Sequence, residues 1–510
     1  MIETKIVNTD RLREIIKSHQ QENRRVVLCY GVFGVLHIGH IRYLKKARKN
    51  GDILVVVLSS DDMKNNEQKK IFESRRAEAL AHLDWVDHVS VNRYDNLFDM
   101  LNFLTPDVYA KGFESVHYDP FNNRRINEKQ VFETIGIEYV MVREDSYNTT
   151  DQINRYLSNF SDEVLNYLST FRKRHKREDL LGIIEKMSQM RVLVIGDAIL
   201  DEYQYCETIG KSSKDPTLVL KYENKDLFAG GVLAVANHAA NFADHVDLVT
   251  VVGDQDDYSN FITQSLKKNI APSFIIKQDT PTLIKRRFID GYSTHKMFEV
   301  YIMDDRPLDK NQEEAFNDII FKKIAACDLV VVADFGHGAI GRKTMDLITD
   351  NHTFLAISTQ SNAGNRGFNT ISKYPRADFV SLAEHEIRLE ARDVEGRLVP
   401  MIKQISKKMG CNQFVVTLGR KGCMILDHGG NLVQVPSFTK NVVDRVGAGD
   451  AFYAVTALLS ALEVESEIVG FLGNIAGSLA VQVMGNQKSI DQRSVIEYCD
   501  DLYAECYYDF

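Results

Sequence analysis

Short apolar runs alternate with amphipathic segments along the first 160 residues of the chain. Runs rich in β-branched residues are predicted strands, and segments with apolar residues every three or four positions are predicted helices. The predicted strands are 25–33, 52–60, 87–91, 106–112 and 137–142, and the predicted helices are 37–50, 73–83, 95–104 and 126–134. Buried strands separated by helices predict a doubly wound α/β domain, whose ligands bind at the carboxyl ends of the parallel strands.

The same alternation returns after residue 190 and continues to the C-terminus. The predicted strands there are 191–196, 246–253, 328–336, 353–359, 378–382, 413–419 and 422–426. Residues 216–231 and 282–303 alternate polar and apolar positions, which predicts antiparallel ribbons that project from the main sheet as a small β lid. Residues 150–189 are polar and helix-forming. We therefore expect a domain over 1–158, a helical linker over 159–189 and a second α/β domain over 190–510.

Composition limits the classes of function. The chain has 510 residues, of which 44% are hydrophobic and 26% charged, with a net charge of -9. This balance is typical of a soluble globular protein and argues against a broad surface for nucleic acid or anionic membranes. The seven scattered cysteines form no zinc motif and favour a reducing compartment. With no signal-peptide core and no apolar run of ~18 residues, we expect a cytoplasmic protein with small-molecule partners.

The first candidate site is the stretch GVFGVLHIGH over residues 31–40. It joins a predicted strand to a helix, and a helix N-terminus presents backbone amides and a partial positive charge to phosphate. Gly31 and Gly39 permit close approach of a nucleotide. His37 and His40, three residues apart, lie on one face of the first helical turn, where they can stabilise charge on a triphosphate under attack.

This stretch resembles the signature of the cytidylyltransferase-like nucleotidyltransferases, and the resemblance extends through 74–89, 106–112 and 146–153. It implies that His37 and His40 are catalytic, and that the enzyme uses CTP or ATP. The nucleotide-binding residues that it implies are Gly31, Phe33, His37, Gly39, His40, Lys69, Lys111, Asn148, Thr149 and Thr150. Gly34 stands where the family has aspartate, and Asn148 where it has serine. Because Gly34 replaces this aspartate, a first domain that has lost its activity remains an alternative interpretation.

A class I aminoacyl-tRNA synthetase is an alternative reading of HIGH, because residues 185–190 read EKMSQM. That stretch directly precedes a predicted strand at Arg191 instead of forming a loop over the first site. The acidic chain also leaves no room for a tRNA-binding module, so we set this reading aside.

The second candidate site is VVDRVGAGDAF over residues 442–452. Gly447, Ala448 and Gly449 form a tight turn before an apolar helix, and their successive amides make an anion hole. Asp450 stands beside this turn, where it can accept the proton of a hydroxyl that attacks the γ-phosphate of ATP.

Residues 190–505 resemble the ribokinase/PfkB-type sugar kinases through VIGDAILDEY, FAGGVLAVANHAANF, DFVSLAEHEI, VVTLGRKG and GNIAGSLAVQVMG. The resemblance implies a sugar site of Asp197, Asp201, Gly230 and Gly231, an ATP site of Thr417, Gly419, Gly422 and Asn474, and Glu386 as an indirect organiser of Mg²⁺. Ala234 and Ala383 replace family asparagines, and polar side chains at nearby strand ends are candidates to restore the lost contacts. These are Asp334, His337, Asn362 and Asn365.

Together the two domains resemble the bifunctional heptose kinase/nucleotidyltransferases of lipopolysaccharide synthesis, with the domain order reversed. The expected fold is an N-terminal doubly wound nucleotidyltransferase domain followed by a ribokinase-like α/β domain with a β lid. The expected function is phosphorylation of a sugar or sugar phosphate by ATP and Mg²⁺, followed by nucleotidyl transfer to a sugar 1-phosphate. The alternatives are a kinase with a degraded first domain and a non-catalytic nucleotide-sensing scaffold. The alternating ribbons also predict a homodimer.

Overall fold

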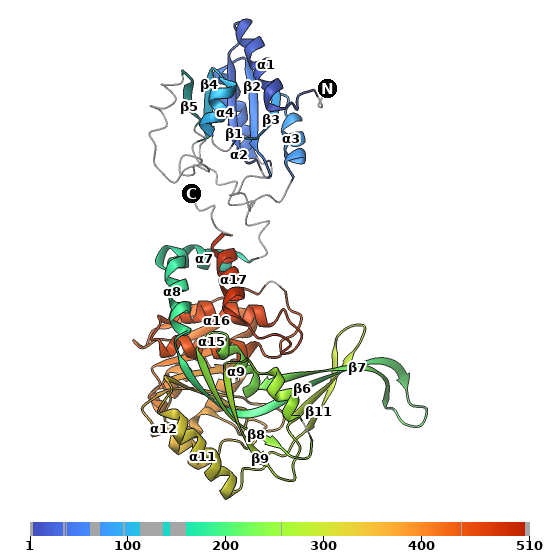
Figure 1. Cartoon of the computed structure of the whole chain (residues 1–510), viewed down its shortest axis with the longest axis vertical. Coiled ribbons are helices and arrows are strands. Elements are labelled where there is room, and N and C mark those ends of the chain that lie inside the picture. Colours follow the sequence, from blue (N-terminus) through green and yellow to red (C-terminus); the bar gives the residue numbers. More distant parts are fainter. Residues whose placement is uncertain are drawn as a thin grey trace. The chain divides into compact units, whose positions relative to one another are not determined.

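The computed structural model describes residues 4–33, 36, 38–61, 72–94, 97–112, 136–142, 160–256, 258–439 and 441–504. The chain divides into two compact units, of which the first ends at Ser158 and the second begins at Asn159 (Figure 1). The helix expected over 126–134 lies outside the described residues.

The first unit is built on a parallel sheet in the order β3-β2-β1-β4-β5. Its strands are β1 (Val26–Gly31), β2 (Ile53–Ser59), β3 (His88–Asn92), β4 (Val108–Gly112) and β5 (Glu138–Val142). Its helices are α1 (Thr9–Gln21), α2 (Ile38–Ala47), α3 (Glu73–Ala81) and α4 (Leu97–Leu104), with a 3₁₀ turn η1 (Arg48–Asn50).

Alternate residues of each strand pack against helices on opposite faces of this sheet. Val27 and Cys29 of β1 face the apolar side chains of α2 and α3, whereas Val26 and Leu28 face those of α1 and α4. The chain leaves β1 toward β2 and leaves β4 toward β5, so its direction of travel reverses between β1 and β4. In doubly wound sheets, ligands bind at the carboxyl ends of the strands at this reversal.

The second unit is built on a 12-stranded sheet. Its strands are β6 (Arg191–Lys211), β7 (Leu218–Gly231), β8 (His245–Gly253), β9 (Ile270–Lys277), β10 (Ile284–Asp290), β11 (Lys296–Ile302), β12 (Leu329–Asp334), β13 (Phe354–Thr359), β14 (Phe379–Ala383), β15 (Gln413–Thr417), β16 (Cys423–Leu426) and β17 (Leu432–Val435). Its helices are α7 (Asp162–Arg174), α8 (Arg177–Met187), α9 (Val232–Ala240), α10 (Ser259–Ser265), α11 (Lys310–Ile324), α12 (Arg342–Thr349), α13 (Glu384–Ala391), α14 (Leu398–Met409), α15 (Ala448–Ala461), α16 (Ser466–Ala480) and α17 (Gln492–Ala504), with 3₁₀ turns η3 (Ile371–Lys373) and η4 (Gly419–Lys421).

The strand β6 belongs to both the main sheet and the lid. Its first residues pair in parallel with β8 and β12, and the residues from Ala198 onward pair with β7 in antiparallel register. The lid is completed by β10, which runs parallel to β6, and by β11, antiparallel to β10. The ribbons formed by β7 and β11 extend away from the layered body of the unit, as predicted (Figure 1).

The helices expected as a linker, α7 and α8, pack into the core of the second unit. Leu168 and Phe171 of α7 are fully buried in the same apolar cluster as the side chains of α15 and α16. The ring of Phe171 stacks on that of Phe471, with centroids 4.1 Å apart. The opposite face of the main sheet packs against α11, α12 and α14, where Phe316 and Ile402 are buried.

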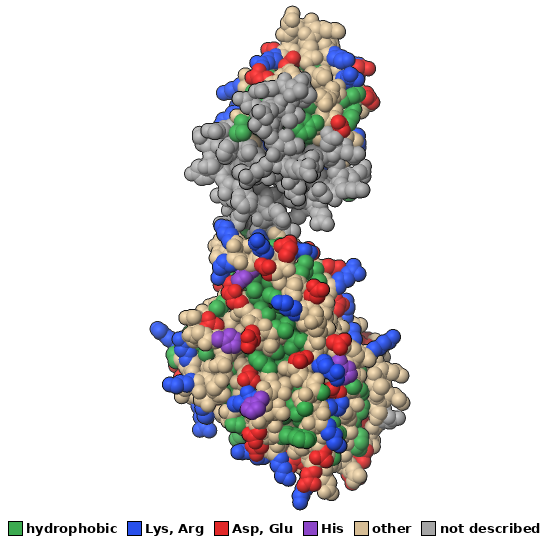
Figure 2. All heavy atoms as spheres, turned by 60° about the vertical axis from the view of Figure 1, so that its left-hand side comes forward, with side chains coloured by type: hydrophobic (Ala, Val, Ile, Leu, Met, Phe, Trp, Pro, Cys, Tyr) green, Lys and Arg blue, Asp and Glu red, His purple; other side chains and the backbone are tan. Residues whose placement is uncertain are grey.

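The described surface is mixed in character. On the face that Figure 2 shows, the coloured basic and acidic side chains of the second unit are interspersed, and neither sign forms a continuous patch. In the described part of the chain, no helix combines the length and apolarity needed to cross a bilayer.

Candidate active sites

A glycine turn at the start of α15 lies at the centre of the candidate site in the second unit. Gly447 has a φ of 82°, and a Cβ on this residue would lie 2.1 Å from Oδ1 of Asn486. Glycine is therefore required both for the left-handed backbone and for the close approach of Asn486. The turn leads Ala448 and Gly449 into the helix N-terminus, where the helix dipole favours an anion.

Asp450 lies in the first turn of α15 and faces charged groups from other elements. Burial, Asp201 and Glu386 raise the pKa of Asp450 to about 7, while the ammonium of Lys285 acts in the opposite direction. The structure thus brings together the predicted base, the predicted sugar-binding aspartate and the predicted magnesium organiser. A carboxylate with a pKa near neutrality suits the acceptance of a proton from a hydroxyl.

Asp201 connects the lid to the glycine turn. It forms an ion pair with Arg287 and accepts a hydrogen bond from Nδ2 of Asn486 at 3.3 Å. A Cβ on Gly230 would lie 2.0 Å from Oδ2 of Asp201, so this position admits only glycine beside the carboxylate. Asn486 touches both Asp201 and Gly447, and it therefore fixes the predicted sugar site against the predicted anion hole.

The inner face of the lid carries functional residues that the sequence analysis missed. Strand register places Lys285 beside Asp201 and beside Tyr301, and it places Arg287 beside Tyr203 and Glu299. Side chains at every second position share one face of a sheet, so these residues all line the side that bears Asp201. The sequence signal was the spacing of Lys285 and Arg287 within the alternating ribbon.

A buried carboxylate attaches the lid to the turn before α15. Asp444 accepts hydrogen bonds from Oη of Tyr203 at 2.6 Å, Nζ of Lys296 at 2.5 Å and the amide of Gly485 at 3.0 Å. Burial alone would raise the pKa of Asp444, but the hydrogen bonds from Lys296 and Tyr203 hold it below its usual value. Asp444 therefore stays ionised and joins β6 and β11 to the turn before α15.

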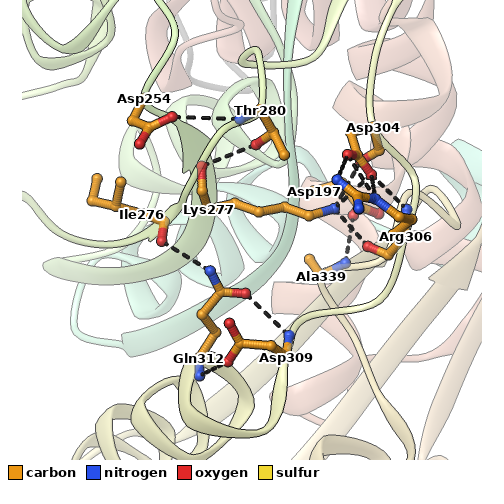
Figure 3. A network of polar contacts seen from close by, with 10 residues as sticks. All are labelled: Asp197, Asp254, Ile276, Lys277, Thr280, Asp304, Arg306, Asp309, Gln312 and Ala339. Atoms are coloured by element: carbon orange, nitrogen blue, oxygen red, sulfur yellow. Dashed lines mark hydrogen bonds and ion pairs between the residues drawn. The ribbon is translucent and has the colours of Figure 1, made fainter.

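The carboxylate of Asp197 accepts hydrogen bonds from three backbone amides. Oδ2 accepts from the amides of Phe335 and His337 at 3.0 and 3.3 Å. Oδ1 accepts from the amide of Ala339 at 3.0 Å (Figure 3). Burial and the neighbouring Asp334 raise the pKa of Asp197 to about 6. Through these contacts Asp197 holds the loop after β12. Its contact with a sugar stays a prediction.

The other polar side chains proposed at these strand ends also have protein partners. Asp334 accepts hydrogen bonds from Tyr374 at 2.5 Å and from the amide of Gly336 at 3.0 Å. Nδ2 of Asn362 and Nδ2 of Asn365 both donate to the carbonyl of Phe335, at 2.8 and 3.1 Å. His337 is buried, and burial together with Lys285 lowers its pKa to about 4, so its ring is neutral.

Glu386 is positioned by two backbone amides at the start of α13. Its Oε2 accepts from Ala383 at 2.7 Å and its Oε1 from Ser361 at 3.0 Å. Burial raises the pKa of Glu386. The carboxylate of Glu386 lies close enough to Asp450 to raise the pKa of Asp450. A divalent cation beside these two acidic groups would reduce the repulsion between their charges.

The predicted ATP residues gather where β15, β16 and β17 end. Nδ2 of Asn474 donates to the carbonyls of Val435 and Pro436, each at 3.2 Å. Gly422 has a φ of 86°, and a Cβ there would lie 2.0 Å from the carbonyl oxygen of Val435. Thr417 ends β15, and the turn η4 that begins at Gly419 joins it to Gly422.

In the first unit, described members of the histidine motif meet at the end of β1. The ring of Phe33 packs against Gly31, where a Cβ would lie 3.1 Å from Phe33 Cε2. Phe33 and His40 make an edge-to-face contact with centroids 5.3 Å apart. Lys111 is buried at the carboxyl end of β4, one residue beyond the register pair of Cys29 and Ala110. The motif therefore lies at the reversal between β1 and β4.

Arg76 is a further residue of this site that the sequence analysis did not single out. It is 1% exposed, and its guanidinium donates to the carbonyls of Val32 and Ser59 at 2.5 and 2.9 Å and to Asp61 at 2.8 Å. It therefore ties together the ends of β1 and β2. The predicted residues Gly34, His37, Lys69, Asn148, Thr149 and Thr150 lie outside the described residues.

Family comparisons match the chain in two parts. A model of pfkB family carbohydrate kinases matches residues 189–493, and a model of cytidylyltransferase-like proteins matches residues 28–277. The second match runs beyond Ser158 into a stretch that folds within the second unit. The predicted domain order, with the cytidylyltransferase-like part first, is confirmed.

Curated relatives share parts of this arrangement. The bifunctional protein HldE of Geotalea uraniireducens is 37% identical over 158 residues, which are 30% of this chain and 31% of that protein. HldE of Bradyrhizobium diazoefficiens is 27% identical over 316 residues, 60% of this chain and 62% of that protein. The chain therefore spans from about a third to about three fifths of the length of these two relatives.

Solved structures confirm the predicted fold class. Phosphofructokinase-2 from Escherichia coli in complex with potassium matches with a TM-score of 0.50 at 15% identity, covering 63% of this chain and 100% of that one. The same enzyme in complex with fructose-6-phosphate matches with a TM-score of 0.50 at 14% identity, covering 62% and 98%. At these identities the likeness is one of fold alone.

Proposed function

The chain belongs to the pfkB family of carbohydrate kinases, and we propose that it is a bifunctional enzyme of nucleotide-sugar synthesis. The second unit phosphorylates a sugar or sugar phosphate with ATP. The first unit transfers a nucleotidyl group from CTP or ATP to a sugar 1-phosphate. The observation that carries the kinase proposal is the meeting of Asp450, Asp201 and Glu386 at the glycine turn of α15.

In the proposed kinase reaction, Asp201 holds the sugar and Asp450 accepts the proton of its attacking hydroxyl. The amides at Gly447, Ala448 and Gly449 stabilise the negative charge on the transferring phosphoryl group. Glu386 fits as the organiser of a nearby Mg²⁺, because its negative charge raises the pKa of Asp450 and a cation would offset that charge. When bound, Mg²⁺ would neutralise charge on the ATP phosphates.

The proposed transferase site is supported by the position of His40 and Lys111 at the reversal of the first sheet. There the N-terminus of α2 and the imidazole of His40 would stabilise charge on the phosphate under attack. Arg76 would keep the ends of β1 and β2 in place beneath the nucleotide.

Two assays on the full chain test the proposal. ADP release with Mg²⁺ and ATP is measured across a panel of sugars and sugar phosphates. Pyrophosphate release is measured with each nucleoside triphosphate and a panel of sugar 1-phosphates. Turnover in both assays is the expected result. A chain that binds nucleotides, as shown by thermal shift, but turns over none of them would be the scaffold that the proposal rejects.

The second candidate is a kinase whose first unit has lost activity, which Gly34 favours because the family has aspartate there. This candidate predicts ADP release without pyrophosphate release. It also predicts that Gly34→Asp would gain pyrophosphate release, whereas in the bifunctional enzyme the wild type already has it.

A further inference from the structure

Two buried lysines of the second unit differ in what surrounds their ammonium groups. Lys277 and Lys285 are 9% and 5% exposed. Nζ of Lys277 donates to the carbonyls of Asp304 and Arg306 at 2.9 and 2.6 Å and to Oδ1 of Asp304 at 3.2 Å (Figure 3). Its hydrogen-bonding capacity is thus met by the protein, as is usual for a buried charge.

The ammonium group of Lys285 has different surroundings. Among the described residues, no acceptor lies within hydrogen-bond distance of its Nζ, which instead lies over the rings of Tyr301 and Phe335, 5.4 and 5.8 Å from their centroids. Two aromatic faces compensate only part of the cost of removing an ammonium group from water. The three donors of Lys285 are therefore available to a ligand.

The charges around Lys285 locate that ligand. Asp201, Asp450 and Asp197 attract its ammonium, while Arg287 repels it. Asp201 is already paired with Arg287, so its charge is largely satisfied without Lys285. Burial lowers the pKa of Lys285. An anion that arrives between Asp450 and the lid would supply the missing acceptors and favour the charged form of the lysine.

We propose that Lys285 is a catalytic residue of the kinase, whose ammonium donates hydrogen bonds to the phosphoryl group during its transfer. The inference rests on the proposed kinase activity. As the oxygen of the sugar hydroxyl bonds to the γ-phosphorus, the bond from this phosphorus to the bridging oxygen of ADP breaks. The hydroxyl proton passes to Asp450 and ADP leaves with the bridging oxygen. Lys285 keeps its protons and stabilises the non-bridging oxygens opposite the amides of the glycine turn.

The contrast with Lys277 makes this role testable. Lys285→Met removes a buried charge that has no hydrogen-bond acceptor among the described residues, so the variant should unfold at the same or a higher temperature than the wild type. Lys277→Met removes three hydrogen bonds from the buried ammonium to Asp304 and Arg306, so its melting temperature should fall. The exposed Lys221, whose ammonium pairs with Glu207, provides the neutral control Lys221→Met.

Turnover is measured as ADP release by the full chain with the best sugar of the panel. Lys285→Met should lower kcat by about 10²–10³-fold, the usual effect of losing one donor to a transition state. Its KM values for ATP and sugar should change much less. Lys277→Met and Lys221→Met should keep most of the wild-type kcat at temperatures where they are folded.

The outcomes separate the inference from the function on which it rests. A wild type that releases no ADP with any sugar refutes the kinase proposal itself. An active wild type whose Lys285→Met variant keeps its kcat refutes the inference alone. A Lys285→Met variant that fails to fold, or melts well below the wild type, also refutes it, because the lysine would then be structural like Lys277.

Discussion

The replacement Asp450→Asn tests the catalytic base through stability and activity together. The structure raises the pKa of Asp450 from 3.8 to about 7 through burial and the neighbouring carboxylates. In the unfolded chain this side chain ionises near its ordinary pKa. The folded protein therefore retains a proton on Asp450 between about pH 4 and pH 7 that the unfolded chain has lost.

The sign and size of the effect follow from this difference in bound protons. Because the folded state binds more protons, the contribution of Asp450 to the free energy of unfolding falls as pH rises through this window, by ~1.4 kcal/mol per pH unit. Over the three or so units the loss reaches on the order of 4 kcal/mol and stays constant above pH 7. Asparagine has no such titration, so Asp450→Asn should gain stability over the wild type as pH rises from 4 to 7.

The assay is urea unfolding of wild type and Asp450→Asn at a series of pH values from 4 to 8.5. Asp215→Asn makes the same change at an exposed position near the end of the lid and serves as the control. A stability difference between wild type and Asp450→Asn that does not change with pH would refute the pKa argument.

Activity provides the second half of this test. Kinase turnover of the wild type should rise with pH up to about 7, because only ionised Asp450 accepts a proton. Asp450→Asn should lose at least ~10²-fold in kcat, the usual scale for a general base. ATP binding should survive, since the amides of the turn remain. A variant that is stabilised at high pH but keeps wild-type turnover would mean that Asp450 is buried without acting as the base.

Three further predictions concern other parts of the chain. His40→Ala should lower pyrophosphate release by about 10²–10³-fold and leave ADP release unchanged; a parallel loss of both activities would count against separate sites. Gly447→Ala should impair ADP release, since its Cβ would lie 2.1 Å from Oδ1 of Asn486 at a φ of 82°; an unimpaired variant would mean that the turn can rearrange. Light scattering at micromolar concentration should report a homodimer, because Phe298 and Val300 of the lid are 46% and 42% exposed; a monomer would refute this assembly.

The fold could be predicted closely because its signals are local. Apolar runs such as Ile53–Ser59 are buried along their whole length, and they gave every described strand of the first unit near its observed bounds. The edge strands β9 and β17 were missed. β9 contains Pro272 and is only partly buried, and β17 has four residues, so neither has the continuous apolar pattern on which the prediction relied.

The length of β6 could not be read from the sequence for a different reason. The predicted strand covers only 191–196, and the residues that follow it are mixed in character. In the structure the strand continues to Lys211, because the residues after Asp201 pair with β7 and β10 instead of being buried between helices. Pairing partners distant in sequence decide such a boundary, and no local pattern records them.

In the candidate sites too, features with a local sequence pattern could be predicted, whereas contacts between distant residues could not. The glycine turn before α15 could be predicted from the GAGD motif, because a glycine turn before a helix has a strong local signature. Lys285, Arg287 and Asn486 could not, because their importance arises only when strand register and a distant loop bring them beside Asp201. Asp197 was predicted to bind the sugar, and the structure adds that its carboxylate accepts hydrogen bonds from three backbone amides. Its contact with the sugar stays a prediction.

Charge balance in the kinase site ties these residues into one argument. Asp201, Asp450 and Glu386 are acidic groups in a single enclosed region, and Arg287 compensates only the first of them directly. Burial and the remaining excess of negative charge raise the pKa of Asp450, which is useful for a base, but this negative charge would also repel the phosphates of ATP. A cation near Glu386 and the ammonium of Lys285, which has no hydrogen-bond acceptor among the described residues, would each offset that repulsion. Lys285 and Asp450 are therefore parts of one arrangement. Burying these two charged groups lowers the stability of the folded protein, and binding of the substrates would raise it again.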